Sequence, residues 1–82
     1  MILKYPVSTE KTLQLVHKEN KLVFIVDVKA TKRAIKEEAE RLFKAGVVGV
    51  NTLITPAGKK RAVITFSKET PAIDVATKLG IM

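Results

Sequence analysis

Cysteine is absent from this sequence, and only one histidine, His17, is present. Without cysteine the chain can form neither a disulfide scaffold nor a cysteine-ligated zinc finger. His17 has no second histidine within ligand spacing and no obvious serine or cysteine to activate. It therefore lacks the partners that a metal site or a catalytic base with a nucleophile requires. We predict no catalytic residue, no metal site and no cofactor.

Long apolar runs are absent as well. The longest, from Leu22 to Val26, is far shorter than the roughly 20 residues of a membrane-spanning helix. The N-terminus lacks the charged start, apolar stretch and small-residue cleavage site of a secretory signal. We expect one small domain, residues 1–82, that stays in the cytoplasm and does not insert into a membrane.

Acidic residues and aromatics are both scarce. Fifteen Lys and Arg against eight Asp and Glu give a net charge of +7, which attracts phosphate backbones or anionic lipid. A lipid-binding chain should carry a basic amphipathic helix with bulky apolar residues, and no segment here has that pattern. With Tyr5 and three phenylalanines as the aromatics, we expect no platform for base stacking. The composition favours nucleic acid, bound through its phosphates and its shape.

Residue patterns predict seven elements in the order β-α-β-α-β-β-α. Strands are expected at 1–5, 21–28, 47–55 and 61–67, with Pro6 ending the first. Helices are expected from Thr9 to near Asn20, from Thr31 to a stop at Gly46, and from a Thr70 cap through Pro71 to Gly80. Gly49 predicts an irregularity in the third strand. The order fits an α/β fold with one sheet covered by helices.

Hydrophobic spacing indicates which faces are buried. Along 21–28, Leu22, Phe24, Val26 and Val28 face one way and Val23 and Ile25 the other, so both faces of this strand require cover. Helical stripes are expected at Ile35, Ala39, Leu42 and Phe43, and at Ile73, Ala76 and Leu79. The acidic cluster Glu37, Glu38 and Glu40 reads as a solvated helix face, with pairs Glu37–Arg41 and Glu40–Lys44.

The second helix begins with the wrong charge. Lys29, Lys32, Arg33 and Lys36 surround its N-terminus, and no acidic residue lies between Val28 and Lys36. A helix N-terminus carries partial positive charge, so each cation in the first turn costs about 0.3–1 kcal/mol where an acid would stabilise. Because bare N–H groups and basic side chains together bind phosphate, we assign this segment, including the capping residue Thr31, to an RNA site.

Two further segments are candidates for RNA contact. Lys59, Lys60 and Arg61 are expected to form a compact positive triad at a hairpin tip, and Asn51 and Thr52 place hydrogen-bonding side chains in the middle of an otherwise apolar strand. Basic hairpin tips also serve to keep sheet edges soluble, and an Asn in a strand often marks a bulge or an exposed side. Together with the helix-start cations, both segments favour RNA binding.

Four motifs in register resemble a known family. They are Pro6 followed by Thr9-Glu10-Lys11, Ala30-Thr31-Lys32 with Ile35-Lys36, Val50-Asn51-Thr52-Leu53, and Lys60-Arg61-Ala62 with Ile64-Thr65. Their order and spacing over nearly the whole chain resemble the large-subunit ribosomal protein numbered twenty-three, the universal family beside the polypeptide exit tunnel.

This resemblance implies a three-layer α/β/α domain with an antiparallel four-stranded sheet that binds large-subunit ribosomal RNA and is not an enzyme. It also implies contact with the ribosomal protein numbered twenty-nine and a docking surface for nascent-chain factors, including the signal recognition particle. In bacterial members the acid of the Ser/Thr-Glu-Lys motif touches the trigger-factor chaperone. Glu10 is the matching residue here, and its neighbour Lys11 is assigned to RNA by its sign.

One departure from the bacterial pattern stands out. Bacterial members carry a long basic loop that enters the tunnel, whereas residues 56–60 are too few to do so. The chain resembles the archaeal short form, for which neither a tunnel-lining role nor a trigger-factor partner is expected.

Two other classes fit some of these features. An acylphosphatase-like domain would share the element order but should show a phosphate loop with an Arg-Asn pair, and none is visible. A free-standing basic RNA-binding regulator or chaperone would fit the charge, and co-sedimentation with large subunits separates it from a ribosomal component.

Overall fold

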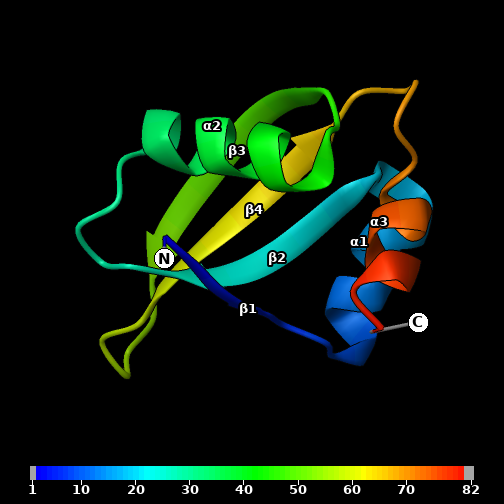
Figure 1. The fold of residues 1–82 in the computed structure, drawn as a ribbon. Helices are drawn as coiled ribbons and strands as arrows, with labels where there is room; N and C mark the ends of the chain where they lie inside the picture. Colours follow the sequence, from blue (N-terminus) through cyan, green and yellow to red (C-terminus); the bar gives the residue numbers. More distant parts are fainter. Residues whose placement is uncertain (1, 81–82) are drawn as a thin grey trace.

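A four-stranded antiparallel sheet with three helices forms the fold (Figure 1) in a computed structural model that describes residues 2–80. The elements are β1 (Leu3–Pro6), α1 (Glu10–Glu19), β2 (Lys21–Val26), α2 (Lys32–Phe43), β3 (Val47–Ile54), β4 (Lys60–Phe66) and α3 (Ala72–Lys78). The strands are ordered β1-β2-β4-β3, which makes β1 and β3 the edges. The predicted element order and sheet type are confirmed, while Met1, expected in the first strand, lies outside the described residues.

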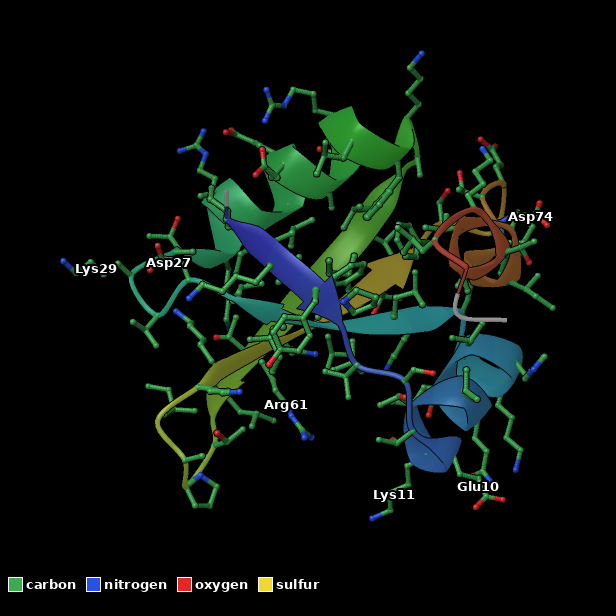
Figure 2. All side chains as sticks on the ribbon, turned by 60° about the horizontal axis from the view of Figure 1, so that its bottom comes forward. Glu10, Lys11, Asp27, Lys29, Arg61 and Asp74 are labelled. Atoms are coloured by element: carbon green, nitrogen blue, oxygen red, sulfur yellow. The ribbon has the colours of Figure 1, made fainter. Side chains whose placement is uncertain are left out.

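The helices cover the two faces of the sheet unequally. Successive side chains of a strand point to opposite faces, and Leu22, Phe24 and Val26 of β2 share one face with Ala62, Ile64 and Phe66 of β4. α2 and α3 lie on that side, and α1 lies at the end of the sheet where β2 begins, with its Val16 buried in the same core (Figures 1 and 2). Most of the second face therefore carries no helix, and we call it the open face.

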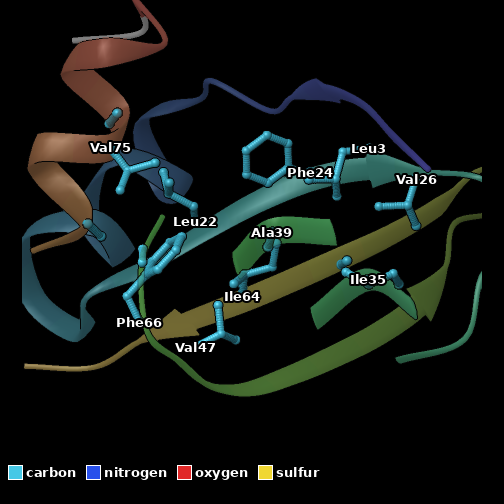
Figure 3. Close-up of a cluster of buried hydrophobic side chains, with 14 of the residues drawn as sticks. Leu3, Leu22, Phe24, Val26, Ile35, Ala39, Val47, Ile64, Phe66 and Val75 are labelled. Atoms are coloured by element: carbon cyan, nitrogen blue, oxygen red, sulfur yellow. The ribbon is translucent and has the colours of Figure 1, made fainter. Parts of the chain in front are cut away.

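The core lies between the sheet and α2 and α3. Ile35 and Ala39 of α2 and Val75 of α3 are buried against Ile64 and Phe66 (Figure 3). Phe43 stacks on Phe24 with ring centroids 5.6 Å apart and meets Phe66 edge-on at 6.2 Å. The three phenylalanines thus occupy core positions, as their spacing predicted.

Asn20 joins α1 and β2 to the segment before α3. Its backbone is left-handed, with φ 58°, and its Nδ2 donates to the carbonyls of Phe66 and Ser67 at 3.0 Å and of Thr70 at 3.3 Å. Its Oδ1 accepts from the N–H of Ala72. The corner between α1 and β2 therefore fixes where α3 begins.

Several predicted boundaries were wrong for local reasons. β2 ends at Val26 because the Asp27 carboxylate accepts the N–H of Lys29 and starts a turn, which leaves Val28 50 % exposed. α2 ends at Phe43 because Lys44, its C-cap, adopts the left-handed conformation at φ 50°, so Gly46 is not its stop. The expected irregularity at Gly49 is confirmed by a register shift between Val47 and Gly49.

The helical stripes also differ in part from prediction. In α3 the buried residues are Ala72, Val75 and Ala76, while Ile73 and Leu79 are 40 % and 36 % exposed. Thr70 does not cap this helix: its hydroxyl accepts the N–H of Gly46 instead, and Pro71 takes the capping position. In α2, Ile35 and Ala39 are buried as expected, but Leu42 is 41 % exposed.

Candidate nucleic-acid interface

The first turn of α2 presents unneutralised positive charge. Thr31 caps the helix, as predicted, by accepting the N–H of Ala34 at 3.1 Å, and no acidic residue lies in the first turn. Within residues 2–80 the N–H groups of Lys32 and Arg33 have no hydrogen-bond partner. The positive end of the helix dipole therefore adds to the charge of the lysines around it.

Most of the cations around this helix start are free of carboxylates. Arg33 contacts Glu37 at 3.7 Å, with both side chains well exposed. Lys29, Lys32 and Lys36 form no ion pair with any residue that the structure describes. Free, exposed lysines at a helix N-terminus are suited to phosphate contacts.

The hairpin between β3 and β4 lies at the same end of the molecule as this helix start (Figure 1). Lys60 Nζ donates to the carbonyl of Ala30 at 2.6 Å and so ties β4 to the segment before α2. Lys59 lies in the hairpin loop and donates to the Tyr5 hydroxyl at 3.0 Å. We call the cations gathered here the basic end: Lys29, Lys32, Arg33, Lys36, Lys59 and Lys60.

Arg61 does not belong to the basic end, so the predicted compact triad is not formed. Lys60 pairs with Val26 and Ile54 in register and points to the helix side, whereas Arg61 pairs with Ile25 and Leu53 on the open face. Neighbouring residues of a strand point to opposite faces, and a contiguous run of charge in a strand is therefore split.

Asn51 and Thr52 are separated in the same way. Asn51 is exposed on the open face opposite Val63, and Thr52 lies on the helix side opposite Ala62. Asn51 thus shares its face with Arg61, while Thr52 does not. Any joint contact by this pair would need RNA on both faces of the strand.

Tyr5 also lies on the open face, and the sequence had given no reason to include it in a site. It pairs with Ile25, which in turn pairs with Arg61, so these three side chains form one row across the sheet. Tyr5 is 45 % exposed and Leu53, which extends the row on β3, is 52 % exposed. The burial of the other aromatics is what sets this tyrosine apart.

Glu10 and Lys11 lie far from the basic end. Both are exposed in the first turn of α1, at the opposite end of the molecule from Lys29 (Figure 2). Thr9 caps this helix through a reciprocal pair of hydrogen bonds with Thr12. The acid and the base of the motif are therefore held on a rigid, solvent-facing helix start.

The acidic cluster of α2 is a solvated face only in part: Glu37 is exposed as the sequence predicted, whereas Glu38 is not. Glu38 is buried, at 8 % exposure, and binds Arg41 and the N–H of Ile2. The hydrogen bond from Arg41 holds the pKa of Glu38 below its usual value, with the Ile2 N–H helping against the opposing effect of burial. Glu37 pairs with Arg33 rather than Arg41, and Glu40 with Lys44 forms no ion pair among the described residues.

Other kinds of site find little support in the described part of the chain. Among residues 2–80, no group of His, Asp and Glu side chains is arranged to hold a metal ion. None of the described helices has the length and apolar character needed to cross a membrane.

Comparison with known proteins identifies the family. The profile of ribosomal protein L23 matches residues 1–77. The chain is 51 % identical over 81 residues to the large ribosomal subunit protein uL23 of Pyrobaculum aerophilum, covering 99 % of this chain and all of that protein. It is 49 % and 50 % identical to the proteins of the same name from Methanococcus aeolicus and Methanococcus vannielii, covering 98 % of this chain and 93 % of each.

These archaeal relatives match along essentially their whole length, which confirms the predicted archaeal short form. The chain belongs to the ribosomal protein L23 family, and it is accordingly a structural protein of the large subunit, located in cytoplasmic ribosomes, and not an enzyme.

Proposed function

We propose that the basic end, together with Thr31, binds the phosphate backbone of large-subunit ribosomal RNA. The observation that carries this proposal is the first turn of α2, where free lysines and unpartnered N–H groups coincide without an acidic residue. Lys60 brings the hairpin to the same end of the molecule, so the cations of two segments can follow one RNA backbone. Phosphate contacts of this kind fix the position of a protein on its RNA.

We further propose that the bound RNA lies near the polypeptide exit tunnel and that the chain does not line the tunnel. The hairpin loop is closed tightly, with the N–H of Thr55 donating to the Lys59 carbonyl at 2.7 Å and that of Gly58 to the Thr55 carbonyl at 2.9 Å. A loop closed over so few residues has no free length to extend. This geometry supports the absence of an extension into the tunnel, while the proposed place near the tunnel rests on membership of the family.

A salt series tests the RNA contact. If four to six phosphates are contacted, a log–log plot of affinity for large-subunit RNA against salt should have a slope of roughly −3 to −5. Replacing Lys32 and Lys36 together by Gln should weaken binding and make the slope shallower by about two, one for each lysine removed. The matched control replaces Lys18 and Lys78, which lie on α1 and α3 away from the basic end. A slope near zero, or equal weakening by both pairs, would refute the site.

Asn51 is proposed to act by hydrogen bonding from the open face, because its amide offers both a donor and an acceptor to a sugar or base edge. Asn51→Ala should lower affinity at every salt concentration and leave the slope unchanged. The same substitution at Thr52, on the helix side, is the control for strand packing. A changed slope with intact affinity at low salt would contradict a direct contact.

Glu10 is proposed to contact protein partners, and Lys11 to contact RNA. Their exposure at the far end of the molecule supports a surface separate from the basic end. The partners proposed are the signal recognition particle and, elsewhere on the surface, the ribosomal protein numbered twenty-nine. Glu10→Gln should leave RNA binding unchanged or slightly stronger and weaken the binding of signal recognition particle to reconstituted subunits. If the variant and parent subunits bind signal recognition particle equally well, Glu10 only stabilises the start of α1, by about 0.3–1 kcal/mol of unfolding free energy.

Membership of the L23 family favours a ribosomal component over the free-standing regulator. Co-sedimentation of the chain with large subunits from cell extract at moderate salt is expected here. Recovery only in fractions lighter than subunits would favour the regulator.

A further inference from the structure

We propose that a cleft beside Tyr5 on the open face binds one unpaired nucleotide of the RNA, with its base against the tyrosine ring and its phosphate on Arg61. This inference rests on the proposed RNA binding but concerns a different surface from the basic end. The cleft lies between the end of β1 and the β3–β4 hairpin loop and has a volume of about 530 Å³. Small-ligand sites commonly have volumes of roughly 300–1,000 Å³, so one nucleotide can be accommodated.

The faces of the Tyr5 ring are free of the nearby lysine. Lys59 Nζ lies 3.0 Å from the hydroxyl and 5.7 Å from the ring centroid. The difference between these two distances is nearly equal to the distance from the ring centroid to the hydroxyl oxygen. The centroid, the oxygen and the ammonium therefore lie almost on one line, with the ammonium beyond the oxygen on the long axis of the ring. Lys59 therefore acts as a hydrogen-bond donor that orients the ring, and it does not cover the ring in a cation–π contact.

Tyr5 lines more than one cleft. A second cleft, of about 380 Å³, shares Tyr5, Ile25 and Lys59 with the first. The Tyr5 side chain, which is 45 % exposed, is therefore accessible from both clefts. An exposed ring held in one orientation is the feature on which splayed-out bases stack in single-stranded RNA.

Arg61 supplies an unsatisfied donor to the same cleft. Its Nε is buried and has no hydrogen-bond partner in residues 2–80, and its guanidinium forms no ion pair with a described carboxylate. Buried donors are almost always paired, because an unpaired one forfeits its hydrogen bonds with water. A phosphate bound by the guanidinium fork would satisfy this donor once the Arg61 side chain turns toward the cleft, since the fork matches phosphate geometry.

The remaining lining favours an anion with a flat apolar part. Ile25 and Pro56 supply apolar surface, and Ser8 and Thr55 also line the cleft. None of the described lining residues is acidic. A paired base inside a duplex cannot reach the ring, and the occupant is therefore an unpaired nucleotide from a loop, bulge or strand end.

The chain carries its own probe for this test. Tyr5 is the sole tyrosine and there is no tryptophan, so tyrosine fluorescence reports on the environment of the Tyr5 ring alone. Adding a short single-stranded oligouridylate should quench the fluorescence, while inorganic polyphosphate of equal charge, which has no bases, should compete for binding without quenching. Equal quenching by the two polymers would overturn the stacking.

Substitutions separate stacking from charge. Tyr5→Leu should weaken oligouridylate binding roughly 5- to 150-fold, the equivalent of about 1–3 kcal/mol for one stacked base. Tyr5→Phe keeps the ring and should bind close to the parent chain. Arg61→Lys keeps the charge but loses the fork, so affinity should fall while the salt slope is unchanged. The control Lys18→Leu removes a cation from α1 and should leave the quenching intact.

Failure of this inference is distinguishable from failure of RNA binding. Steeply salt-dependent binding of large-subunit RNA with unaltered tyrosine fluorescence, and with Tyr5→Leu equal to the parent, would refute the cleft alone. Absence of salt-dependent RNA binding by the parent chain would refute both.

Discussion

Replacing Asn20 should destabilise the fold more than any surface substitution, because one side chain holds two corners together. Its amide contacts three carbonyls and its Oδ1 accepts a hydrogen bond from a fourth group, the Ala72 N–H. Nδ2 has two hydrogens, so two carbonyl bonds are strong and the third is shared. With about 0.5–1.5 kcal/mol for each of roughly three net hydrogen bonds, Asn20→Gly should lose about 3 kcal/mol of unfolding free energy.

The backbone conformation supplies an independent check. Glycine adopts φ 58° without strain, whereas a β-carbon there is disfavoured by about 1–2 kcal/mol. The strain makes Asn20→Ala less stable than Asn20→Gly, while the greater entropy of the unfolded glycine chain partly offsets this difference. The alanine variant should therefore be less stable by about 1 kcal/mol. Asn20→Asp keeps the size and the acceptor but turns the two donors into a carboxylate facing carbonyls, so it should be at least as harmful as Gly.

Urea unfolding followed by far-ultraviolet circular dichroism measures these differences. In thermal melts, a domain of this size should show a Tm lowered by about 10–20 °C for Asn20→Gly. A loss below about 1 kcal/mol, or an alanine variant more stable than the glycine variant, would refute the reasoning about the hydrogen bonds or about the backbone.

Two further predictions concern charge on α2. Lys32→Glu, in the first turn, should raise the unfolding free energy by about 1 kcal/mol in urea titrations while it weakens RNA binding. Lys36→Glu should raise the unfolding free energy by less, since residue 36 lies beyond the first turn and the new carboxylate would face Glu40. Equal gains at both sites would contradict the dipole argument. The second prediction concerns Glu38, whose pKa is lowered in the folded state. Its carboxylate therefore stabilises the fold fully above the unfolded pKa of about 4.3, and this stabilisation is lost as the pH falls through the folded pKa. Urea midpoints should therefore decline in acid for the parent chain and decline less for Glu38→Gln, and parallel curves would show that Glu38 does not contribute.

The order of the elements and much of the core could be predicted from sequence, because these depend on local patterns. The caps Thr9 and Thr31 and the alternation through β2 follow from short-range spacing, and the structure confirms them. The end of β2 was missed because one carboxylate, on Asp27, turns the chain while the hydrophobic alternation continues to Val28. The cap of α3 was missed because Thr70 bonds to Gly46, a contact between distant residues.

The candidate site was predictable in its charges but not in its grouping. The first turn of α2 required only the sequence of one helix, and it is as expected. Lys60 and Arg61 were separated by strand alternation, which requires the boundary of β4 to be known to the residue. Tyr5 came into one row with Arg61, with Ile25 between them, only through the pairing of β1 with β2 and of β2 with β4, a long-range register that no local pattern encodes.

The tight closure of the β3–β4 loop has a consequence for length variation in this family. Both strands beyond the loop are held in register against their neighbours, so an insertion inside β4 would move every later core residue to the opposite face. The loop itself can accept added residues without that shift. Lengthening it, however, would carry Pro56 and Lys59 away from β1 and remove the wall that faces Tyr5. A long tunnel-directed loop and a closed cleft beside β1 are therefore alternative uses of the same few positions.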